Sequence, residues 1–275
     1  MALNCWLVGV IIQSLIVIND ESYTPTRWQA TLFIFAAALG IGAFNVFGIK
    51  HLPLAEGIFV TAHFGAFFPV IIAILVLAPK ASPREVFLTF SDNGAGWPSV
   101  GWATMVGQLS SMFCVLGESD LLQQDGTDCL GSDSVAHMAE EVGEASIIVP
   151  KAMVWSFAIN IPFTFGMVIS YLFCIKSIPD ALSDPTGFPF IYVFRQATGS
   201  TGGTTGLTVV IFLLITMITT SAMASTSRQT FAFGRDKGLP FGSWIGHVSC
   251  TSRLRASTFQ LRLAPSLLHI LIVSR

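Results

Sequence analysis

Charge is scarce in this sequence. Only 11% of its 275 residues are Asp, Glu, Lys or Arg, whereas soluble domains carry about 25% charged residues. Hydrophobic residues make up 52% of the chain, and the mean hydropathy is +0.69. The formal net charge is −2, so no excess of basic residues points to a nucleic-acid partner. These values exclude an ordinary soluble domain and indicate an integral membrane protein.

Motifs that would indicate a metal centre, a disulfide framework or glycosylation are missing as well. The five cysteines show no CxxC or comparable ligand spacing, and most lie in or beside apolar runs, where cysteine behaves as a small hydrophobe. The segment HMAEE, which begins at His137, matches neither HExxH nor HxxEH. No Asn-x-Ser/Thr acceptor occurs, so no glycosylation site indicates which loops lie on the extracellular side of the membrane. We therefore expect no metal ion and no cofactor.

What the sequence has instead is a series of long apolar stretches. A helix needs about 20 apolar residues to cross the hydrocarbon core, and in lipid a helix satisfies its own backbone hydrogen bonds. The first stretch lacks the basic start and the cleavage site of a signal peptide, so we expect a membrane helix whose upstream part is missing. The pattern predicts an all-α membrane bundle of about six spans: 1–19, 28–49, 57–79, 97–117 continued by 132–145, 152–175 and 206–227.

Local signals refine the last two spans. The segment ATGSTGGTTG, which ends at Gly206, is expected to be a flexible connector, and no Lys-Ser/Thr follows it to suggest a phosphate-binding loop. Pro150 is expected in the first turn of the helix that spans 152–175. Basic residues cluster after the last span, in SRQTFAFGRDKGLP. This cluster favours placing that end of the chain in the cytoplasm.

The fourth span is interrupted by a polar run. Residues 115–141 read VLGESDLLQQDGTDCLGSDSVAHMAEE, in which Leu-Gly precedes an acidic, serine-bearing pair twice. Val135 and Met138 share a helical face, and Asp133 or Ser134 can cap that helix. One interpretation is a discontinuous membrane helix, whose free N–H and C=O groups at membrane depth meet a ligand, as in secondary transporters. The alternative is a simple turn between a span and a surface helix.

Three blocks of the sequence carry a resemblance to a known family. SDSVAHMAEEVGEASIIVPKAMVWS, PDALSDPTGFPFIYVFRQATGS and STSRQTFAFGRDKGLPFGSWI closely resemble the fungal amino-acid, GABA and choline permeases of the amino acid–polyamine–organocation superfamily. The resemblance implies two inverted five-helix repeats, with the first and sixth helices broken at the midplane and the substrate between the breaks. On that plan the spans are similar to family helices three to eight. The resemblance therefore implies a truncated member that lacks the first helix.

The resemblance also divides the chain into three parts. Residues 1–249 resemble the transporter core. The family runs straight from the apolar half-helix into the Ser-Asp break, so residues 118–131 look inserted. Their edges can be encoded with splice-like signals, which suggests a short retained intron, and a genuine polar loop is the alternative. The tail, residues 250–275, departs from the family through a frameshift or misread intron, or as a basic helix lying on the membrane surface.

The break supplies the candidate substrate site. Gly117 would free its carbonyl and let the backbone approach the ligand. Ser132 and Ser134 would offer hydroxyl groups beside a helix N-terminus, which carries partial positive charge. Asp133 belongs to the same break, although it could simply cap the helix. Phe113, one turn before the break, could close over a ligand or stack on a cationic head group, or it could pack against lipid or core.

Charged residues near the cytoplasmic side are candidates for an inner gate. Glu140 and Glu141 are expected to form a charge network with Lys151, Arg228 or Arg235. A solvated acidic face is the alternative. Hydroxyl residues at 219–221 could line the cavity, but packing between membrane helices explains them better.

These features favour a secondary transporter. The expected activity is proton-coupled transport of a small nitrogenous solute (an amino acid, GABA or choline) by alternating access. The expected location is the plasma membrane, as a multi-pass protein. An enzyme is disfavoured because no nucleophile–base set or paired intramembrane carboxylates occur in the sequence. A non-transporting remnant, or the product of a misread gene, is the alternative because of the insertion and the tail.

Overall fold

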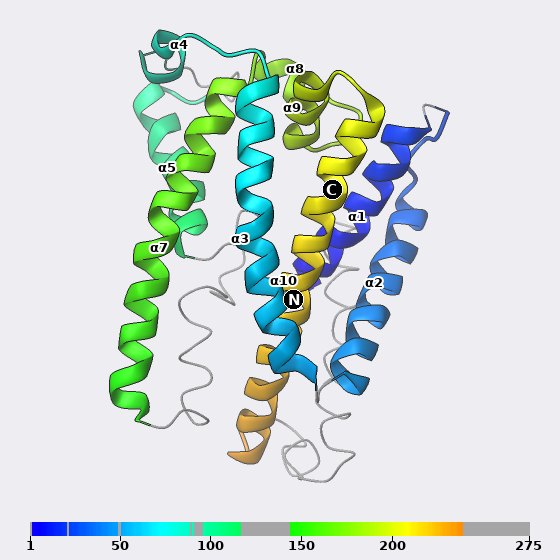
Figure 1. The fold of residues 1–275 in the computed structure, drawn as a ribbon, viewed down its shortest axis with the longest axis vertical. Coiled ribbons are helices and arrows are strands. Elements are labelled where there is room, and N and C mark those ends of the chain that lie inside the picture. The colour runs from blue at the N-terminus through cyan, green and yellow to red at the C-terminus, as the bar shows by residue number, and fades with distance from the viewer. Residues whose placement is uncertain are drawn as a thin grey trace.

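The computed structural model describes residues 2–20, 22–48, 51–88, 90, 96–116 and 144–238, with only the backbone described at 53 and 109–116. The regular structure in this part of the chain is helical (Figure 1). The helices are α1 (Ala2–Asn19), α2 (Arg27–Phe47), α3 (Leu52–Leu77), α4 (Pro83–Leu88), α5 (Val100–Leu116), α7 (Ala145–Cys174), α8 (Ile178–Leu182), α9 (Pro189–Thr198) and α10 (Thr201–Arg235).

Most of the predicted spans are present as long apolar helices. Among the described residues, five helices are long and apolar enough to cross a membrane: α1, α2, α3, α7 and α10. The segment predicted as a span over 97–117 contains α5, a helix of 17 residues that is not among these five. The predicted all-α membrane bundle is therefore confirmed. The predicted continuation of the fourth span over 132–145 lies outside the described residues as far as 143, and Ala145 at its end begins α7.

Helix α10 is longer than predicted at both ends. It begins at Thr201 and ends at Arg235, so the prediction of a flexible connector up to Gly206 was wrong. Ser200 is the N-cap, and its Oγ accepts a hydrogen bond from the backbone N–H of Gly203 at 3.1 Å. A serine cap stabilises a helix start by about 1 kcal/mol. This offsets part of the helix-destabilising effect of the glycines in the first turns.

Helix α7 starts earlier than predicted. It begins at Ala145, and Glu144 before it adopts the left-handed region at φ 53°. Pro150 therefore lies inside the helix, and the prediction that it occupies the first turn was wrong. Since proline has no N–H, the carbonyl of Ser146 loses its helical donor. This is a single hydrogen bond close to the helix end, and the apolar helical run continues on both sides of it.

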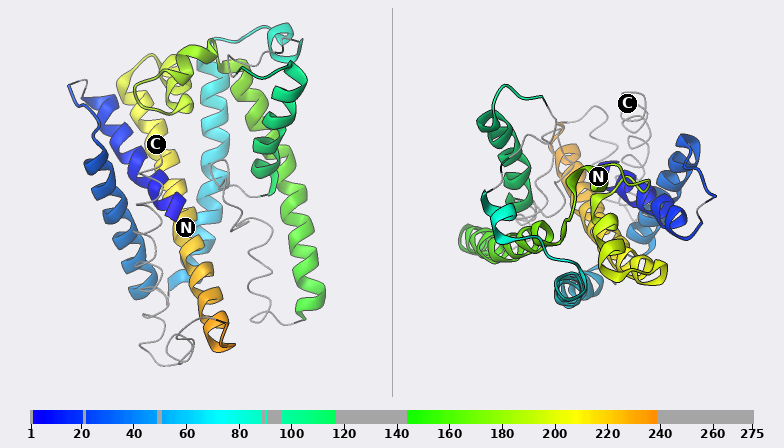
Figure 2. Two further views of the ribbon diagram at one scale, coloured as in Figure 1. Left: turned by 180° about the vertical axis from the view of Figure 1, so that it is seen from behind. Right: turned by 90° about the horizontal axis from the view of Figure 1, so that it is seen from above.

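Helix α10 is the hub of the described bundle. It contacts α1, α2, α3 and α9, and α1 and α2 form an antiparallel pair beside it (Figures 1 and 2). The α1–α2 pair is close because Gly9 has no side chain. A Cβ atom at Gly9 would lie 2.8 Å from the backbone nitrogen of Ile34. Any larger residue at this position would push the two helices apart.

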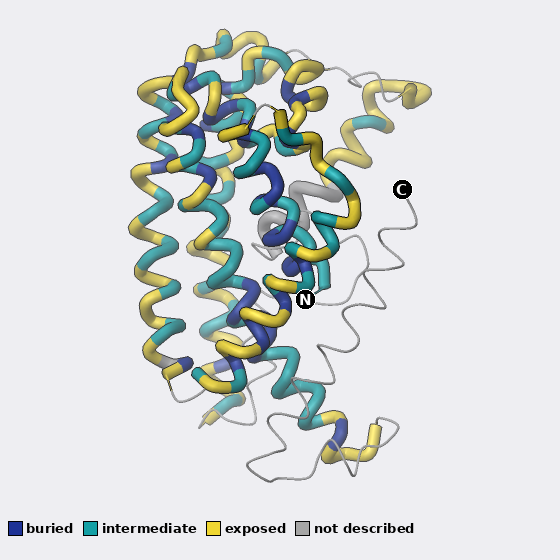
Figure 3. Tube along the Cα trace, turned by 90° about the vertical axis from the view of Figure 1, so that its right-hand side faces the viewer, coloured by how far each residue is buried: buried dark blue, intermediate teal, exposed yellow. Residues whose placement is uncertain are grey.

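The two ends of the bundle differ. We call the end that carries α8 and α9 the outer end, and the end where α10 reaches Arg235 the inner end (Figure 1). Exposed and buried stretches alternate along the helices (Figure 3), which is the pattern of helices that meet lipid on one side. The larger buried apolar cluster joins α3, α7 and α9 near the outer end: Val70, Ile74, Ala78, Cys174, Val193, Phe194 and Ala197.

Candidate functional site

The predicted break begins where the described part of α5 stops. This helix runs from the outer end along α7, which it contacts, and is described as far as Leu116 (Figure 1). Phe113 lies in the last turn of α5, in the part described by backbone alone. The predicted substrate and gating roles therefore stay predictions. The residues that lie outside the described part of the chain are Gly117, Ser132, Asp133, Ser134, Glu140 and Glu141.

Helix α10 presents a row of buried hydroxyl residues to the bundle interior. Thr204 and Thr208 near its outer end, and Thr219 and Thr220 farther along, are buried. Each hydroxyl donates to the carbonyl four residues earlier in the same helix, at 2.6–2.9 Å. Their donor capacity is therefore used within α10. This supports the interpretation of residues 219 and 220 as helix-packing residues.

A buried amide links α2 to α10. The Nδ2 of Asn45 donates to the carbonyl of Ile41 at 3.1 Å and to the carbonyl of Thr220 at 3.2 Å. The sequence reasoning missed this contact. A lone asparagine inside a charge-free run was the available signal, because a polar side chain at that depth needs a partner on its own or a neighbouring helix.

A polar turn fastens the outer end to α1. The Oδ1 of Asp184 accepts hydrogen bonds from the backbone N–H of Thr186 at 2.9 Å and from its hydroxyl. The Oδ2 of Asp184 lies 3.5 Å from an NH1 group of Arg195, and the two side chains are 3% and 46% exposed. The hydroxyl of Ser14, on α1, donates to the carbonyl of Thr186 at 3.0 Å in a buried contact. The segment from α8 to α9 is therefore attached to α1 as well as to α10.

Some interior polar atoms have unused hydrogen-bonding capacity. Among the described residues, the buried atoms without a hydrogen-bond partner are Nδ2 of Asn4, the hydroxyl of Tyr171 and Oε1 of Gln196. The Nε2 of Gln196 donates to the hydroxyl of Tyr192 at 2.7 Å, so only one end of that amide is satisfied. A buried polar atom of this kind is costly unless water or a solute meets it.

The inner end carries the basic residues of the predicted gate. Arg228 and Arg235 lie in the last turns of α10. The Nε of Arg235 lies 3.2 Å from Oδ1 of Asp236, and both side chains are about half exposed or more. An exposed pair of neighbours contributes little to stability. The predicted partners on the 132–145 segment fall outside the described residues.

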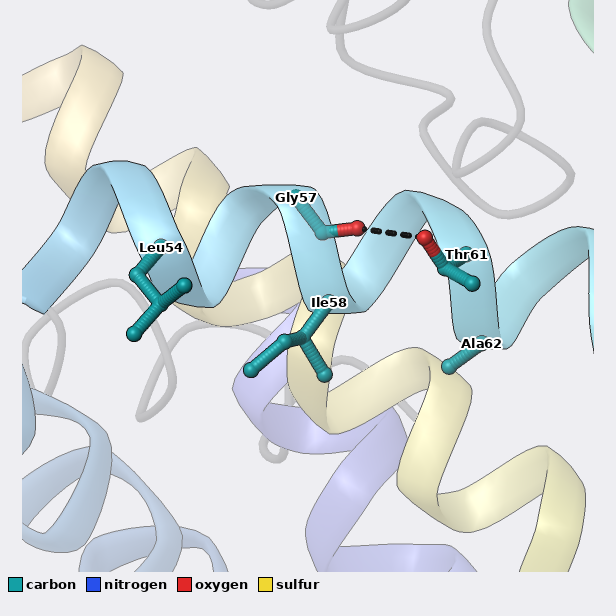
Figure 4. Close-up of a pocket in the computed structure, with 5 residues that line it drawn as sticks. All are labelled: Leu54, Gly57, Ile58, Thr61 and Ala62. Carbon is teal, nitrogen blue, oxygen red and sulfur yellow. Dashed lines mark hydrogen bonds between the residues drawn. The ribbon is translucent and has the colours of Figure 1, made fainter.

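A groove of about 470 Å³ runs along α3, but its chemistry does not fit a nitrogenous solute (Figure 4). The hydroxyl of Thr61 in its wall donates to the carbonyl of Gly57 at 2.8 Å. The groove lies on the side of α3 roughly opposite its buried residues, Val70 and Ile74. It therefore belongs to the perimeter of the bundle. Its lining residues are Leu54, Gly57, Ile58, Thr61 and Ala62.

Titratable groups in the described part of the chain suggest no metal chemistry. No three His, Cys, Asp or Glu side chains in this part gather closely enough to hold a metal ion. In the loop between α1 and α2, the pKa of Asp20 is lowered because the hydroxyl and the backbone N–H of Ser22 donate to its Oδ1, at 2.6 and 3.0 Å. This shift has a local structural cause and marks a turn.

Apolar helices of this length, packed around α10 with its buried hydroxyl groups, define a multi-pass α-helical membrane protein. The model of the amino acid permease family matches residues 1–274. The chain therefore belongs to the amino acid permease family, as the resemblance of its three blocks predicted.

Three curated relatives show the range of names in its neighbourhood. A protein of Macrophomina phaseolina assigned as an amino acid/polyamine transporter is 29% identical over 252 residues, covering 91% of this chain and 52% of the relative. The choline transporter of Saccharomyces cerevisiae is 26% identical over 234 residues, covering 84% and 39%. The thiamine transporter of Schizosaccharomyces pombe is 32% identical over 128 residues, covering 45% and 22%. The chain spans about half or less of the length of these relatives.

Proposed function

We propose that this chain forms part of a secondary transporter that moves a small nitrogenous solute across the plasma membrane by alternating access. The single observation that carries the proposal is the family match, which extends over residues 1–274. The solute class follows from the relatives, whose names refer to amino acids or polyamines, choline and thiamine. All of these compounds contain a basic or quaternary nitrogen or an amino group.

The proposed site is the break in the fourth span. Gly117 and the hydroxyl residues Ser132 and Ser134 would meet the solute, and Phe113 would close over it. Backbone groups freed at a helix break are suited to this task because they carry partial charges and need partners. Glu140 and Glu141, paired with the basic end of α10, would control access from the inner end.

The proposed coupling ion is the proton. Helices α1, α2, α7 and α10 contain no Asp or Glu, so few described groups inside the bundle can carry a proton. Asp133 in the break is the proposed carrier, since a carboxyl group near a dry interior can exchange a proton as the access side changes.

Uptake by the chain reconstituted in liposomes tests the proposal. We expect saturable uptake of labelled choline, GABA or an amino acid that collapses when an uncoupler removes the proton gradient. Asp133→Asn should abolish coupled uptake, whereas Asp180→Asn, an exposed acid on α8, should leave it unchanged. Absence of uptake of every solute in these three classes, or equal loss in both variants, would contradict the proposal.

The second candidate is a chain that does not transport, and the polar run at 118–131 favours it. If this run is an insertion, it separates the two halves of the proposed site. Sequencing the transcript across these codons distinguishes the cases. A transcript without them would make the corrected chain the one to assay, and residues 1–249 without 118–131 would then form the proposed core. A transcript that contains them would favour the non-transporting product. The same sequencing shows whether the transcript also encodes the tail at 250–275.

A further inference from the structure

Two neighbouring helices each contain an internal proline. Pro69 lies inside α3 and Pro162 lies inside α7, and these helices contact each other. Because proline has no N–H, Pro69 cannot donate to the carbonyl of Gly65, and Pro162 cannot donate to that of Ala158. A lost backbone hydrogen bond of this kind is the commonest cause of a helix kink. Each helix therefore has a defined point of low bending stiffness.

An aromatic cluster brings the two points to the same level of the bundle. Phe163 directly follows the proline of α7, and Phe68 directly precedes the proline of α3. The ring centroid of Phe163 lies 5.5 Å from that of Phe64, 4.9 Å from that of Phe67 and 6.1 Å from that of Phe68. All three pairs are edge-to-face, which is the favourable arrangement of aromatic rings. One side chain of α7 thus contacts a full turn of α3 just below its proline.

Packing changes at the same level. On the outer side of the prolines, Val70 and Ile74 of α3 and Cys174 of α7 are buried in the cluster with α9. On the inner side, the described residues of α3 and α7 contribute no member to this cluster. Exposed apolar side chains occur on both sides of the prolines. The outer half of each helix is therefore held against α9, and among the described residues the inner halves share no comparable buried cluster.

We propose that Pro69 and Pro162 form one shared hinge, about which the inner halves of α3 and α7 swing together while their outer halves stay fixed against α9. Phe163 keeps the two hinge points in contact, because its ring belongs to the outer half of α7 and packs against the inner half of α3. A transporter would use such a motion to open its inner end. The proposal itself concerns the bending of two helices and does not depend on transport.

Pulsed electron–electron distance measurements test the hinge directly. The full chain, with its five native cysteines replaced by alanine, is placed in lipid nanodiscs without solute. One pair of spin labels, Val60→Cys with Val154→Cys, reports the inner halves, and a second pair, Val76→Cys with Val168→Cys, reports the outer halves. All four positions are exposed, so the labels replace no buried side chain.

The expected result is a broad distance distribution for the inner pair and a narrow one for the outer pair. Replacing both hinge prolines (Pro69→Ala with Pro162→Ala) restores the missing backbone donors and should narrow the inner distribution by about half. Pro150→Ala is the matched control, because Pro150 lies in α7 but away from the ring cluster, and it should leave both widths unchanged. Phe163→Ala should broaden the inner distribution further.

Two outcomes would overturn the proposal. One is an inner distribution whose width does not change in the double variant, and the other is equal narrowing by Pro150→Ala. If the double variant changes the distance distribution of the outer pair, the single Pro69→Ala variant is measured instead. A narrower inner distribution in that variant supports the hinge, and an unchanged inner distribution contradicts it. The distance measurement does not depend on uptake, so the hinge can be tested even in a chain that does not transport. If the helices prove rigid, the transport proposal is still tested separately by the uptake assay.

Discussion

The outer and inner ends of this bundle are built differently, although the same helices reach both. At the outer end, α9 buries Val193 and Phe194 against α3 and α7, and the Asp184 turn is hydrogen-bonded to α1. At the inner end, the described residues of α3 and α7 belong to no such buried cluster. The comparison teaches that the described contacts that join α3, α7 and α9 are concentrated at one end of the bundle. This is the difference on which the proposed hinge rests.

The largest expected effect comes from removing the central ring of the outer cluster. Phe194→Ala deletes a side chain that is 1% exposed, and we expect a loss of about 3 kcal/mol in the free energy of unfolding. Ile58→Ala, on the exposed face of α3 toward the inner end, should cost well under half of that. Unfolding by SDS in mixed micelles, followed by circular dichroism, measures both. Equal losses would show that the two ends are packed alike.

Removing the carboxylate of the outer turn should have the next largest effect. Asp184→Ala leaves the N–H and hydroxyl of Thr186 without their acceptor, which costs about 1–3 kcal/mol. The pairing with Arg195 adds little, because that side chain is about half exposed. Asp180→Ala, an exposed acid on neighbouring α8, should change stability by at most about 0.5 kcal/mol. A similar loss of unfolding free energy in both variants would show that the Asp184 turn contributes no more to stability than an exposed acid does.

A smaller effect is expected from the amide that joins α2 to α10. Asn45→Ala removes the hydrogen bond to the carbonyl of Thr220 and should cost about 1 kcal/mol in the same SDS assay. The matched control is Thr31→Ala, since the exposed hydroxyl of Thr31 bonds only within α2, to the carbonyl of Arg27. An Asn45 variant as stable as the control would indicate that packing alone holds these helices together.

The smallest effect concerns the loop between α1 and α2. Ser22→Ala removes the hydroxyl that donates to Asp20, so the lowered pKa of Asp20 should move back up toward its ordinary value. A lowered folded-state pKa stabilises the fold above the unfolded pKa, and this contribution is lost as the pH falls through the folded pKa. The carboxyl carbon shift of Asp20, followed by NMR over a pH titration, measures the change. An unchanged titration would assign the shift to another cause.

The sequence predicted the class of fold because long apolar runs have few alternatives in lipid. It predicted the helix ends less well, because caps and prolines act locally. The segment around Gly203 was expected to be a loop from its glycines, yet the cap at Ser200 starts α10 before them. Pro150 was expected to mark a helix start, yet α7 continues through it. In both cases, a residue type with a strong average preference was outweighed by its neighbours.

The candidate site was predicted from a resemblance, and its residues lie in the part that the structure does not describe, apart from the backbone of Phe113 and the basic residues of α10. The polar contacts that the structure does describe were not predicted. The contact from Ser14 to Thr186 spans 172 residues, and the one from Asn45 to Thr220 spans 175. No local pattern in a single sequence can predict a hydrogen-bond acceptor that lies so far along the chain.

These two separations have a consequence for how the protein is made. The hub, α10, is synthesised after the other spanning helices that the structure describes, yet it contacts α1, α2 and α3. When α2 is synthesised, the amide of Asn45 can donate to the carbonyl of Ile41 on its own helix, but the carbonyl of Thr220 has not yet been made. The hydrogen bond between α2 and α10 therefore forms only after α10 has been synthesised. Helix α10, the last helix that the structure describes, thus joins helices that were synthesised long before it.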